Sequence, residues 1–284
     1  MALRVACLQL EAPAPGEGVE ARQERVQDDL ADLAGAGTGV DLVVLPELWP
    51  AGYFAFDRYR EVATPLDGPL LGESGALAGL ARRLSAVVHA GSVVEAGPGP
   101  EHPLHNTSAV FGPDGRRLAV YRKIHVFGYR SAEQELVAPG EEVATFELSG
   151  LRAGMATCYD LRFPELFRRL AGDVACYVVP ASWPAARADH WTTLLRARAI
   201  EDQAYVVGCN AAGTDHGVAL AGRSAVVDPW GQVVAEAGEG PCRLDVTVDL
   251  DAVAAVRAEM PVLADRRLRD PGAGAGAGAG PSSS

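Results

Sequence analysis

The sequence predicts a mixed α/β fold in which helices cover two sheets, a four-layer α-β-β-α sandwich. Short apolar runs typical of strands alternate with segments of helical periodicity, which favours parallel strands joined by helices. Two other pairs of strands are separated by the tight-turn sequences Pro113-Asp114-Gly115 and Pro229-Trp230-Gly231, which are typical of antiparallel hairpins. A purely parallel sheet would lack such hairpins, so we expect two mixed sheets.

The expected helices and strands follow one another along the whole chain. Val26, Leu30 and Leu33 recur at the spacing of one helical face, and Pro164 occupies the first turn of a helix, where proline is favoured. The expected helices cover residues 19–33, 76–84, 164–170 and 189–203. The expected strands cover residues 5–10, 40–45, 86–94, 106–112, 116–121, 143–148, 151–157, 174–179, 205–209, 224–228 and 232–236.

One domain is expected over residues 1–271, because no linker rich in Pro, Gly or Ser separates two sets of apolar segments. The chain has 284 residues, a length that single α/β domains reach. Residues 272–284 alternate Gly with Ala and end in Pro-Ser-Ser-Ser. This stretch has no large apolar side chain to bury, so we expect a disordered tail.

The net charge and the cysteines of the chain indicate which partners it can bind and in which cellular compartment it is found. The 25 Lys and Arg residues stand against 37 Asp and Glu, and a net charge of −12 repels nucleic acid and anionic lipid. No apolar run approaches the roughly 20 residues of a membrane span, and no secretory signal is expected at the N-terminus. The five cysteines form no CxxC pair, which indicates neither a disulfide framework nor a zinc ribbon and favours a cytoplasmic location.

Three residues stand where catalytic groups gather in α/β proteins, at the ends of strands. Glu47 follows the run 42–45, Lys123 follows a hairpin strand, and Cys158 ends the strand before a helix. A thiol needs a nearby base, which a glutamate in a dry pocket supplies, and a lysine stabilises the charge of a tetrahedral intermediate. Alone, Glu47 could cap a segment and Lys123 could be a surface lysine; together the three predict an acyl-transfer site.

Among the cysteines, only Cys158 is placed as a nucleophile. It lies at a strand-to-helix turn, where backbone N–H groups and the helix dipole are expected to favour a thiolate. Cys7, Cys176 and Cys209 lie within strands as small hydrophobic residues, and Cys242 has no context that promotes it.

The segments around these residues resemble the nitrilase superfamily of carbon–nitrogen hydrolases. They are Leu-Pro-Glu-Leu-Trp around Glu47, Tyr-Arg-Lys-Ile-His-Val-Phe around Lys123, and Cys-Tyr-Asp-Leu-Arg-Phe-Pro-Glu-Leu from Cys158. The resemblance runs from residue 3 to about residue 250 and implies the four-layer sandwich, a Glu-Lys-Cys triad and a homodimer or larger assembly. A second glutamate of the family matches Glu133, with Glu135 as the alternative.

The resemblance also implies a mechanism on a small amide substrate. Glu47 takes the proton of Cys158, and the thiolate attacks the amide carbon while Lys123 and the backbone N–H of Tyr159 hold the oxyanion. Glu47 then protonates the departing ammonia and activates water to hydrolyse the thioester. Glu133 orients Lys123 and the substrate amide. No metal or cofactor is expected, because the six histidines show no ligand spacing such as HExxH.

The segment 181–187, Ala-Ser-Trp-Pro-Ala-Ala-Arg, and the helix after it are similar to the omega-amidase branch. That similarity implies a short 2-oxo acid bearing a terminal amide, whose far carboxylate needs a local cation. Arg187 is the candidate, against a simple surface arginine. Trp183 is expected to line the acyl pocket, against a purely packing role.

Other interpretations stay open. Deaminated glutathione, a plain aliphatic amide or an N-carbamoyl amino acid could be the substrate. A papain-like site would pair Cys158 with His125, although this leaves the glutamate and the lysine unexplained. The chain could also be a non-catalytic member of the family. Arg162 follows the cysteine closely and could pair with Asp160 or Glu165 as part of the scaffold.

Overall fold

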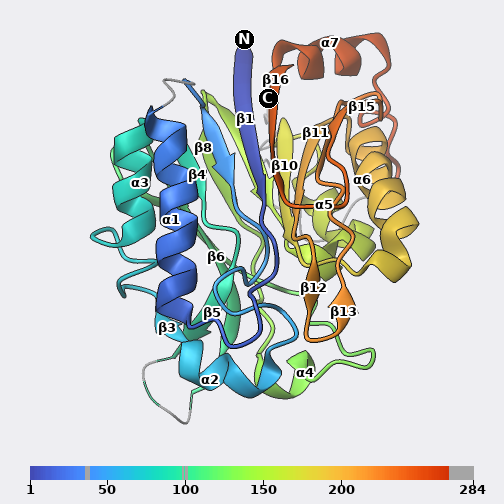
Figure 1. Cartoon of the computed structure of the whole chain (residues 1–284). Helices are drawn as coiled ribbons and strands as arrows, with labels where there is room; N and C mark the ends of the chain where they lie inside the picture. The colour runs from blue at the N-terminus through green and yellow to red at the C-terminus, as the bar shows by residue number, and fades with distance from the viewer. Residues whose placement is uncertain (36–38, 98, 100–101, 269–284) are drawn as a thin grey trace, which may run out of the picture.

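The computed structural model shows two mixed sheets packed face to face between two layers of helices (Figure 1). It describes residues 1–35, 39–97, 99 and 102–268. The larger sheet has the order β16 (Cys242–Asp249), β1 (Ala2–Gln9), β2 (Leu42–Val44), β4 (Val87–His89), β6 (His105–Phe111), β5 (Val93–Ala96) and β3 (Thr64–Pro65), with β7 (Arg117–Arg122) paired to β6. The smaller sheet has the order β15 (Val233–Glu236), β14 (Ala225–Val227), β11 (Tyr205–Asn210), β10 (Cys176–Ala181), β9 (Leu151–Met155) and β8 (Thr145–Leu148).

Helices form the outer layers. The α-helices are α1 (Val19–Gly35), α2 (Tyr59–Val62), α3 (Ala76–Leu84), α4 (Glu133–Leu136), α5 (Pro164–Leu170), α6 (Ala188–Asp202) and α7 (Asp251–Glu259). Short 3-10 turns are η1 (Phe56–Arg58), η2 (Cys158–Arg162) and η3 (Ala185–Arg187), and β12 (Thr214–Asp215) pairs with β13 (Val218–Ala219). Because α1 and α3 cover the larger sheet while α5 and α6 cover the smaller one, the predicted α-β-β-α arrangement is confirmed (Figure 1).

The inner strands are buried on both faces, as their continuous apolar runs predict. Successive side chains of a strand point to opposite sides of a sheet. In β1, Val5 and Cys7 accordingly join the core that also holds residues of β10 and β11, whereas Ala6 and Leu8 pack in the core under α1 and α3. This arrangement fixes the strand ends from which the candidate catalytic residues extend: parallel strands for Glu47 and Cys158, and the antiparallel strand β7 for Lys123.

A turn at Gly91 holds the loop that carries one of these residues. The single strand expected over 86–94 is wrong, because the chain breaks into β4 and β5 at this glycine. Gly91 has φ +64°, and a Cβ there would lie 2.0 Å from the carbonyl oxygen of Pro46. The amide of Ser92 donates to that oxygen at 3.2 Å, and the Ser92 hydroxyl accepts from the amide of Leu48 at 3.0 Å. The loop with Glu47 is therefore clamped on both sides.

Two elements at the C-terminal end were not predicted, although β16 carries a readable signal. Leu244, Val246 and Val248 alternate with polar residues at the period of a half-buried strand, and β16 pairs antiparallel with β1. The tail predicted over 272–284 lies outside the described residues, and the one-domain organisation over 1–271 stays a prediction. No helix in the described part of the chain is long and apolar enough to cross a membrane.

Substitution of Gly91 tests the clamp on the catalytic loop. Gly91→Ala introduces an unfavourable positive φ and a clash with a backbone oxygen, so we expect a loss of about 3 kcal/mol or more in the free energy of unfolding. Gly150→Ala is the control, because Gly150 has φ +77° but open space around its Cβ position; there we expect only about 1–2 kcal/mol. Urea unfolding measures both, and equal losses would contradict the proposed clamp.

Candidate active site

Glu47 lies in the loop after β2, at the junction of the two sheets. Its side chain is fully buried. Its Oε1 accepts a hydrogen bond from Lys123 Nζ at 2.8 Å, and its Oε2 accepts from the amide of Ser182 at 3.0 Å. The Ser182 hydroxyl donates to the backbone oxygen of Glu47 at 2.8 Å. Because Ser182 follows β10 of the smaller sheet, the carboxylate is fixed by both sheets.

Lys123 follows β7 and is buried between two carboxylates. Its Nζ lies 2.8 Å from Glu47 Oε1 and 3.1 Å from both carboxylate oxygens of Glu133. Burial lowers the pKa of Lys123, but the charges of Glu133 and Glu47 outweigh it and raise this pKa well above its ordinary value. The lysine is therefore a permanent ammonium at neutral pH.

Glu133, rather than Glu135, is the second glutamate at this site. Its side chain is fully buried in α4, whereas Glu135 is exposed. Its carboxylate accepts hydrogen bonds from Lys123 Nζ, Asn106 Nδ2, the Tyr53 hydroxyl and the amide of Phe127. The choice between the two glutamates that the sequence left open is thus made by which side of α4 faces the lysine.

Cys158 begins η2 and is held in an unusual backbone conformation. Its φ is +47°, in the left-handed region that side chains rarely adopt. A capping box fixes this turn, since the amide of Thr157 donates to Asp160 Oδ2 at 2.8 Å and the Thr157 side chain accepts a hydrogen bond from the backbone of Asp160. The turn sets the sulfur close to the carboxylate of Glu47, whose charge acts on the thiol.

The thiolate expected at this turn is wrong. Burial and the Glu47 carboxylate raise the pKa of Cys158 well above its ordinary value, against the opposing effect of Lys123. The short 3-10 turn does not offset the loss of water around the sulfur. At neutral pH the group is therefore a thiol, and it can attack only as a neighbouring base removes its proton.

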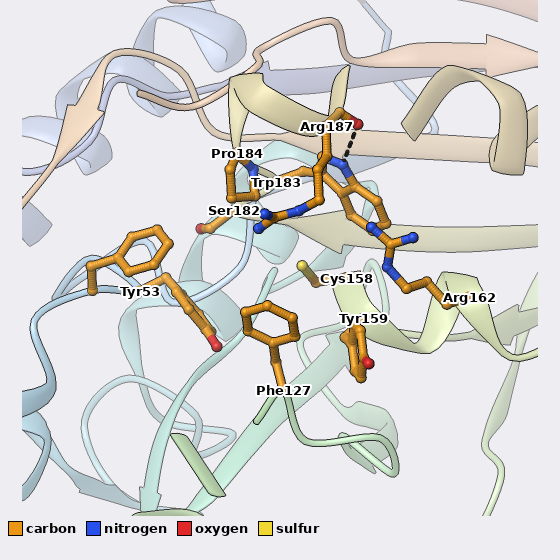
Figure 2. A pocket seen from close by; sticks show the side chains of 10 residues that line it. Tyr53, Phe127, Cys158, Tyr159, Arg162, Ser182, Trp183, Pro184 and Arg187 are labelled. Carbon is orange, nitrogen blue, oxygen red and sulfur yellow. Dashed lines mark hydrogen bonds between the residues drawn. The ribbon is translucent and has the colours of Figure 1, made fainter. Parts of the chain in front are cut away.

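The sulfur opens into a small pocket with an empty volume of about 320 Å³. Figure 2 shows Cys158 at its centre, with Arg187 and Trp183 on one side and Phe127 and Tyr159 on the other. The amide of Tyr159 lies in the first turn of η2, where N–H groups have no intrahelical acceptor. The pocket thus combines a nucleophilic atom, aromatic walls and a backbone donor next to the sulfur.

Two arginines reach this pocket. The Arg187 guanidinium carbon lies 5.7 Å from the ring centroid of Phe127, and that of Arg162 lies 4.6 Å from the ring centroid of Trp183. The ion pair with Asp160 or Glu165 that the sequence left open for Arg162 is not formed: among the described residues neither arginine has a carboxylate within salt-bridge distance. Burial and Arg187 lower the pKa of Arg162, because two positive charges share the pocket.

Trp183 both lines the pocket and supports an arginine. It is 2% exposed, and its amide donates to Asn210 Oδ1 at 2.7 Å. Its Nε1 donates to the backbone oxygen of Arg187 at 2.8 Å, as the dashed line in Figure 2 shows. The wall-lining and packing roles considered from the sequence therefore coexist.

His125 belongs to a different set of contacts. Its backbone amide and its Nδ1 lie 2.9 Å and 2.8 Å from Asp160 Oδ1, and its ring stacks on Phe163 at 3.8 Å. The thiol of Cys158 lies close to Glu47 instead, so the geometry gives no support to a papain-like site. Within the described ranges, no group of three or more His, Cys, Asp or Glu side chains could hold a metal ion.

Asn106 was missed by sequence reasoning. Its Nδ2 donates to Glu47 Oε1 at 2.9 Å and to Glu133 Oε1 at 3.0 Å. The available signal was a polar residue inside a strand that is otherwise buried, at β6. Such a residue must find hydrogen-bond partners, but the sequence does not show which ones.

Comparisons with known proteins identify the family of the chain. The carbon-nitrogen hydrolase family model matches residues 4–258. The 2-oxoglutaramate amidase of Paenarthrobacter nicotinovorans is 42% identical over 257 residues, which cover 88% of this chain and 85% of that protein. Human omega-amidase NIT2 is 35% identical, over 82% of this chain and 85% of its own. The structure of XC1258 from Xanthomonas campestris, a CN-hydrolase superfamily protein with an arsenic adduct in its active site, has a TM-score of 0.85 and 32% identity, covering 96% of this chain and 100% of that chain.

Removing the carboxylate charge tests the coupling between Glu47 and Cys158. In Glu47→Gln the negative charge that raises the pKa of Cys158 is lost, so we expect this pKa to fall. Titration of the ultraviolet thiolate absorbance, taken as the difference from the same variant carrying Cys158→Ala, measures it. Glu135→Gln is the control and should leave the titration unchanged. A midpoint in Glu47→Gln at or above that of the unchanged protein would contradict the contact.

Proposed function

The chain belongs to the carbon–nitrogen hydrolase family of the nitrilase superfamily, and we propose that it hydrolyses the terminal carboxamide of a small 2-oxo acid to carboxylate and ammonia through a thioester on Cys158. One observation carries the proposal: the thiol of Cys158 lies close to a buried carboxylate, which is itself paired with a buried ammonium, and it faces a pocket with two arginines that have no carboxylate partner in the described chain. Thiol, base and cation are the parts that acyl transfer requires.

Acylation follows from the positions of these groups. Glu47 accepts the thiol proton as the sulfur of Cys158 bonds to the amide carbon, and the carbonyl electron pair moves onto oxygen. Lys123 and the amide of Tyr159 stabilise that oxyanion. The carbonyl then re-forms, the C–N bond breaks, and Glu47 returns its proton to the nitrogen, so that ammonia leaves and the acyl group remains on sulfur.

Hydrolysis of the thioester reuses the same base. Water attacks the thioester carbon as Glu47 takes one of its protons, and the carbonyl electron pair again moves onto oxygen. When the carbonyl re-forms, the C–S bond breaks and the proton passes from Glu47 to Cys158. Glu133 keeps Lys123 in place through both steps and orients the substrate amide. Because Lys123 stays charged throughout, proton transfer is confined to Glu47.

The pocket supports an anionic substrate in particular. A protein with a net charge of −12 opposes the approach of a carboxylate, so a local cation is needed to bind one. Arg187 and Arg162 supply it, and an arginine binds a carboxylate through two parallel hydrogen bonds. The relative that is 42% identical is a 2-oxoglutaramate amidase, which supports the same substrate class.

Location and assembly complete the proposal. We expect a cytoplasmic protein, because all five cysteines are free thiols in the structure. A homodimer or larger homo-oligomer is expected from the family resemblance.

Ammonia release from a panel of 2-oxo acid amides, aliphatic amides and carbamoyl amino acids tests the reaction. We expect the highest kcat/KM on a 2-oxo acid amide, and a loss of at least about 1,000-fold in Cys158→Ala. Cys242→Ala, at an exposed cysteine, should retain activity. Full activity in Cys158→Ala, or no hydrolysis of any panel member by the unchanged enzyme, would overturn the proposal.

The pocket arginines decide how the far carboxylate is held. In Arg187→Met we expect KM for 2-oxo acid amides to rise about 10- to 100-fold, while kinetics on neutral aliphatic amides change little. Arg83→Met removes an exposed arginine of α3 and controls for net charge. An equal KM increase for charged and neutral amides would show that Arg187 has a structural role only.

A further inference from the structure

A neutral amide stands between the two buried carboxylates of the site. Asn106 is 1% exposed, on β6, and its backbone oxygen accepts the amide N–H of Lys123 at 2.9 Å. Its Nδ2 donates to Glu47 Oε1 at 2.9 Å and to Glu133 Oε1 at 3.0 Å. The backbone hydrogen bond between Asn106 and Lys123 therefore helps to position both side chains.

Lys123 and Asn106 bridge the same two oxygen atoms. Nζ of the lysine and Nδ2 of the asparagine each reach Glu47 Oε1 and Glu133 Oε1. Two carboxylates face one ammonium here, so one negative charge is not balanced within the cluster. Two like charges in a buried site favour uptake of a proton by one of them. A second donor between the same oxygens opposes that uptake.

The orientation of the amide is fixed by charge. If the Asn106 side chain were rotated by half a turn, its Oδ1 would face two carboxylate oxygens without a proton between them. In the observed orientation, Oδ1 is buried and has no hydrogen-bond partner among the described residues. A buried acceptor without a donor destabilises a fold. Packing alone therefore does not explain an asparagine at this position, whereas donation to the two glutamates does.

The same contacts direct the proton of Cys158. Glu47 Oε1 already accepts two hydrogen bonds, from Lys123 and Asn106, whereas Oε2 accepts one from the amide of Ser182. A carboxylate oxygen offers about two acceptor sites, so Oε2 is the atom with one left. Cys158 lies close to this carboxylate, so we expect its proton to pass to Oε2.

We propose that Asn106 is a positioning residue of the reaction: it keeps Glu47 and Glu133 ionised together and reserves Glu47 Oε2 for the proton that leaves Cys158. This inference rests on the proposed amidase function. In the acylation step the S–H proton passes to Oε2, the sulfur electron pair forms the bond to the amide carbon, and the carbonyl pair moves to oxygen. Asn106 does not line the pocket and acts through its hydrogen bond to Glu47.

Asn106→Leu tests the role, with Thr107→Val as the matched control. Thr107 is the next residue of β6, is equally buried, and donates to Glu95 away from the site. In Asn106→Leu we expect kcat to fall about 10- to 100-fold, because the base is protonated or misdirected in part of the molecules. KM should change less than about threefold, since Asn106 does not line the pocket. The acidic limb of the kcat/KM profile should move to higher pH than in Thr107→Val, because the second donor to the two carboxylates is lost.

Asn106→Ser is the second variant, because its hydroxyl adds no bulk and is too short to bridge both carboxylates; we expect the same changes. Infrared titration supplies a measurement that does not need activity: the band of buried protonated carboxyl groups should develop at a higher pH in both variants than in Thr107→Val. If kcat, the acidic limb and the infrared titration all match those of Thr107→Val, the role of Asn106 is wrong. If the unchanged enzyme hydrolyses no amide, the proposed function is wrong. In that case the infrared titration alone tests Asn106, and an unshifted titration would overturn its proposed role.

Discussion

The buried ammonium of Lys123 is the interaction on which the rest of the site depends. Removing a charge from water is costly, and a buried cation is stable only where anions and hydrogen bonds compensate it. Glu47 and Glu133 provide that compensation from two separate segments, the loop after β2 and the helix α4. The lysine therefore joins these segments at one point. Glu47 also accepts a hydrogen bond from the amide of Ser182, and so links the larger sheet to the end of β10 in the smaller one.

This cluster assigns different protonation states to groups that lie side by side. Burial and the charge of Glu47 keep Cys158 a thiol, whereas the charges of Glu133 and Glu47 keep Lys123 an ammonium. A resting thiol in a dry site reacts only when a substrate is in place and its proton has an acceptor. In the proposed function the aromatic walls of the pocket limit the size of the substrate, and we expect its two arginines to bind an anionic end.

The sequence predicted the layers and the three central residues because both follow from local patterns. The helices at 76–84 and 164–170 have the predicted bounds, since periodicity and a proline mark them. Residues whose roles depend on distant packing were harder to predict. Asn106 owes its proposed role to contacts made only in the folded chain, and Glu133 is distinguished from Glu135 only by the side of α4 that meets the lysine. The strand break at Gly91 likewise depends on a backbone oxygen 45 positions earlier in the chain. The thiolate predicted at Cys158 was wrong because a local dipole was weighed without the burial that opposes it.

Mass spectrometry of the protein quenched during turnover of a 2-oxo acid amide tests the central claim most directly. We expect the peptide containing Cys158 to gain the mass of the substrate less ammonia, and this adduct to disappear as the carboxylate product accumulates. Ammonia release without any such adduct under single-turnover conditions, or an adduct on a different residue, would contradict it.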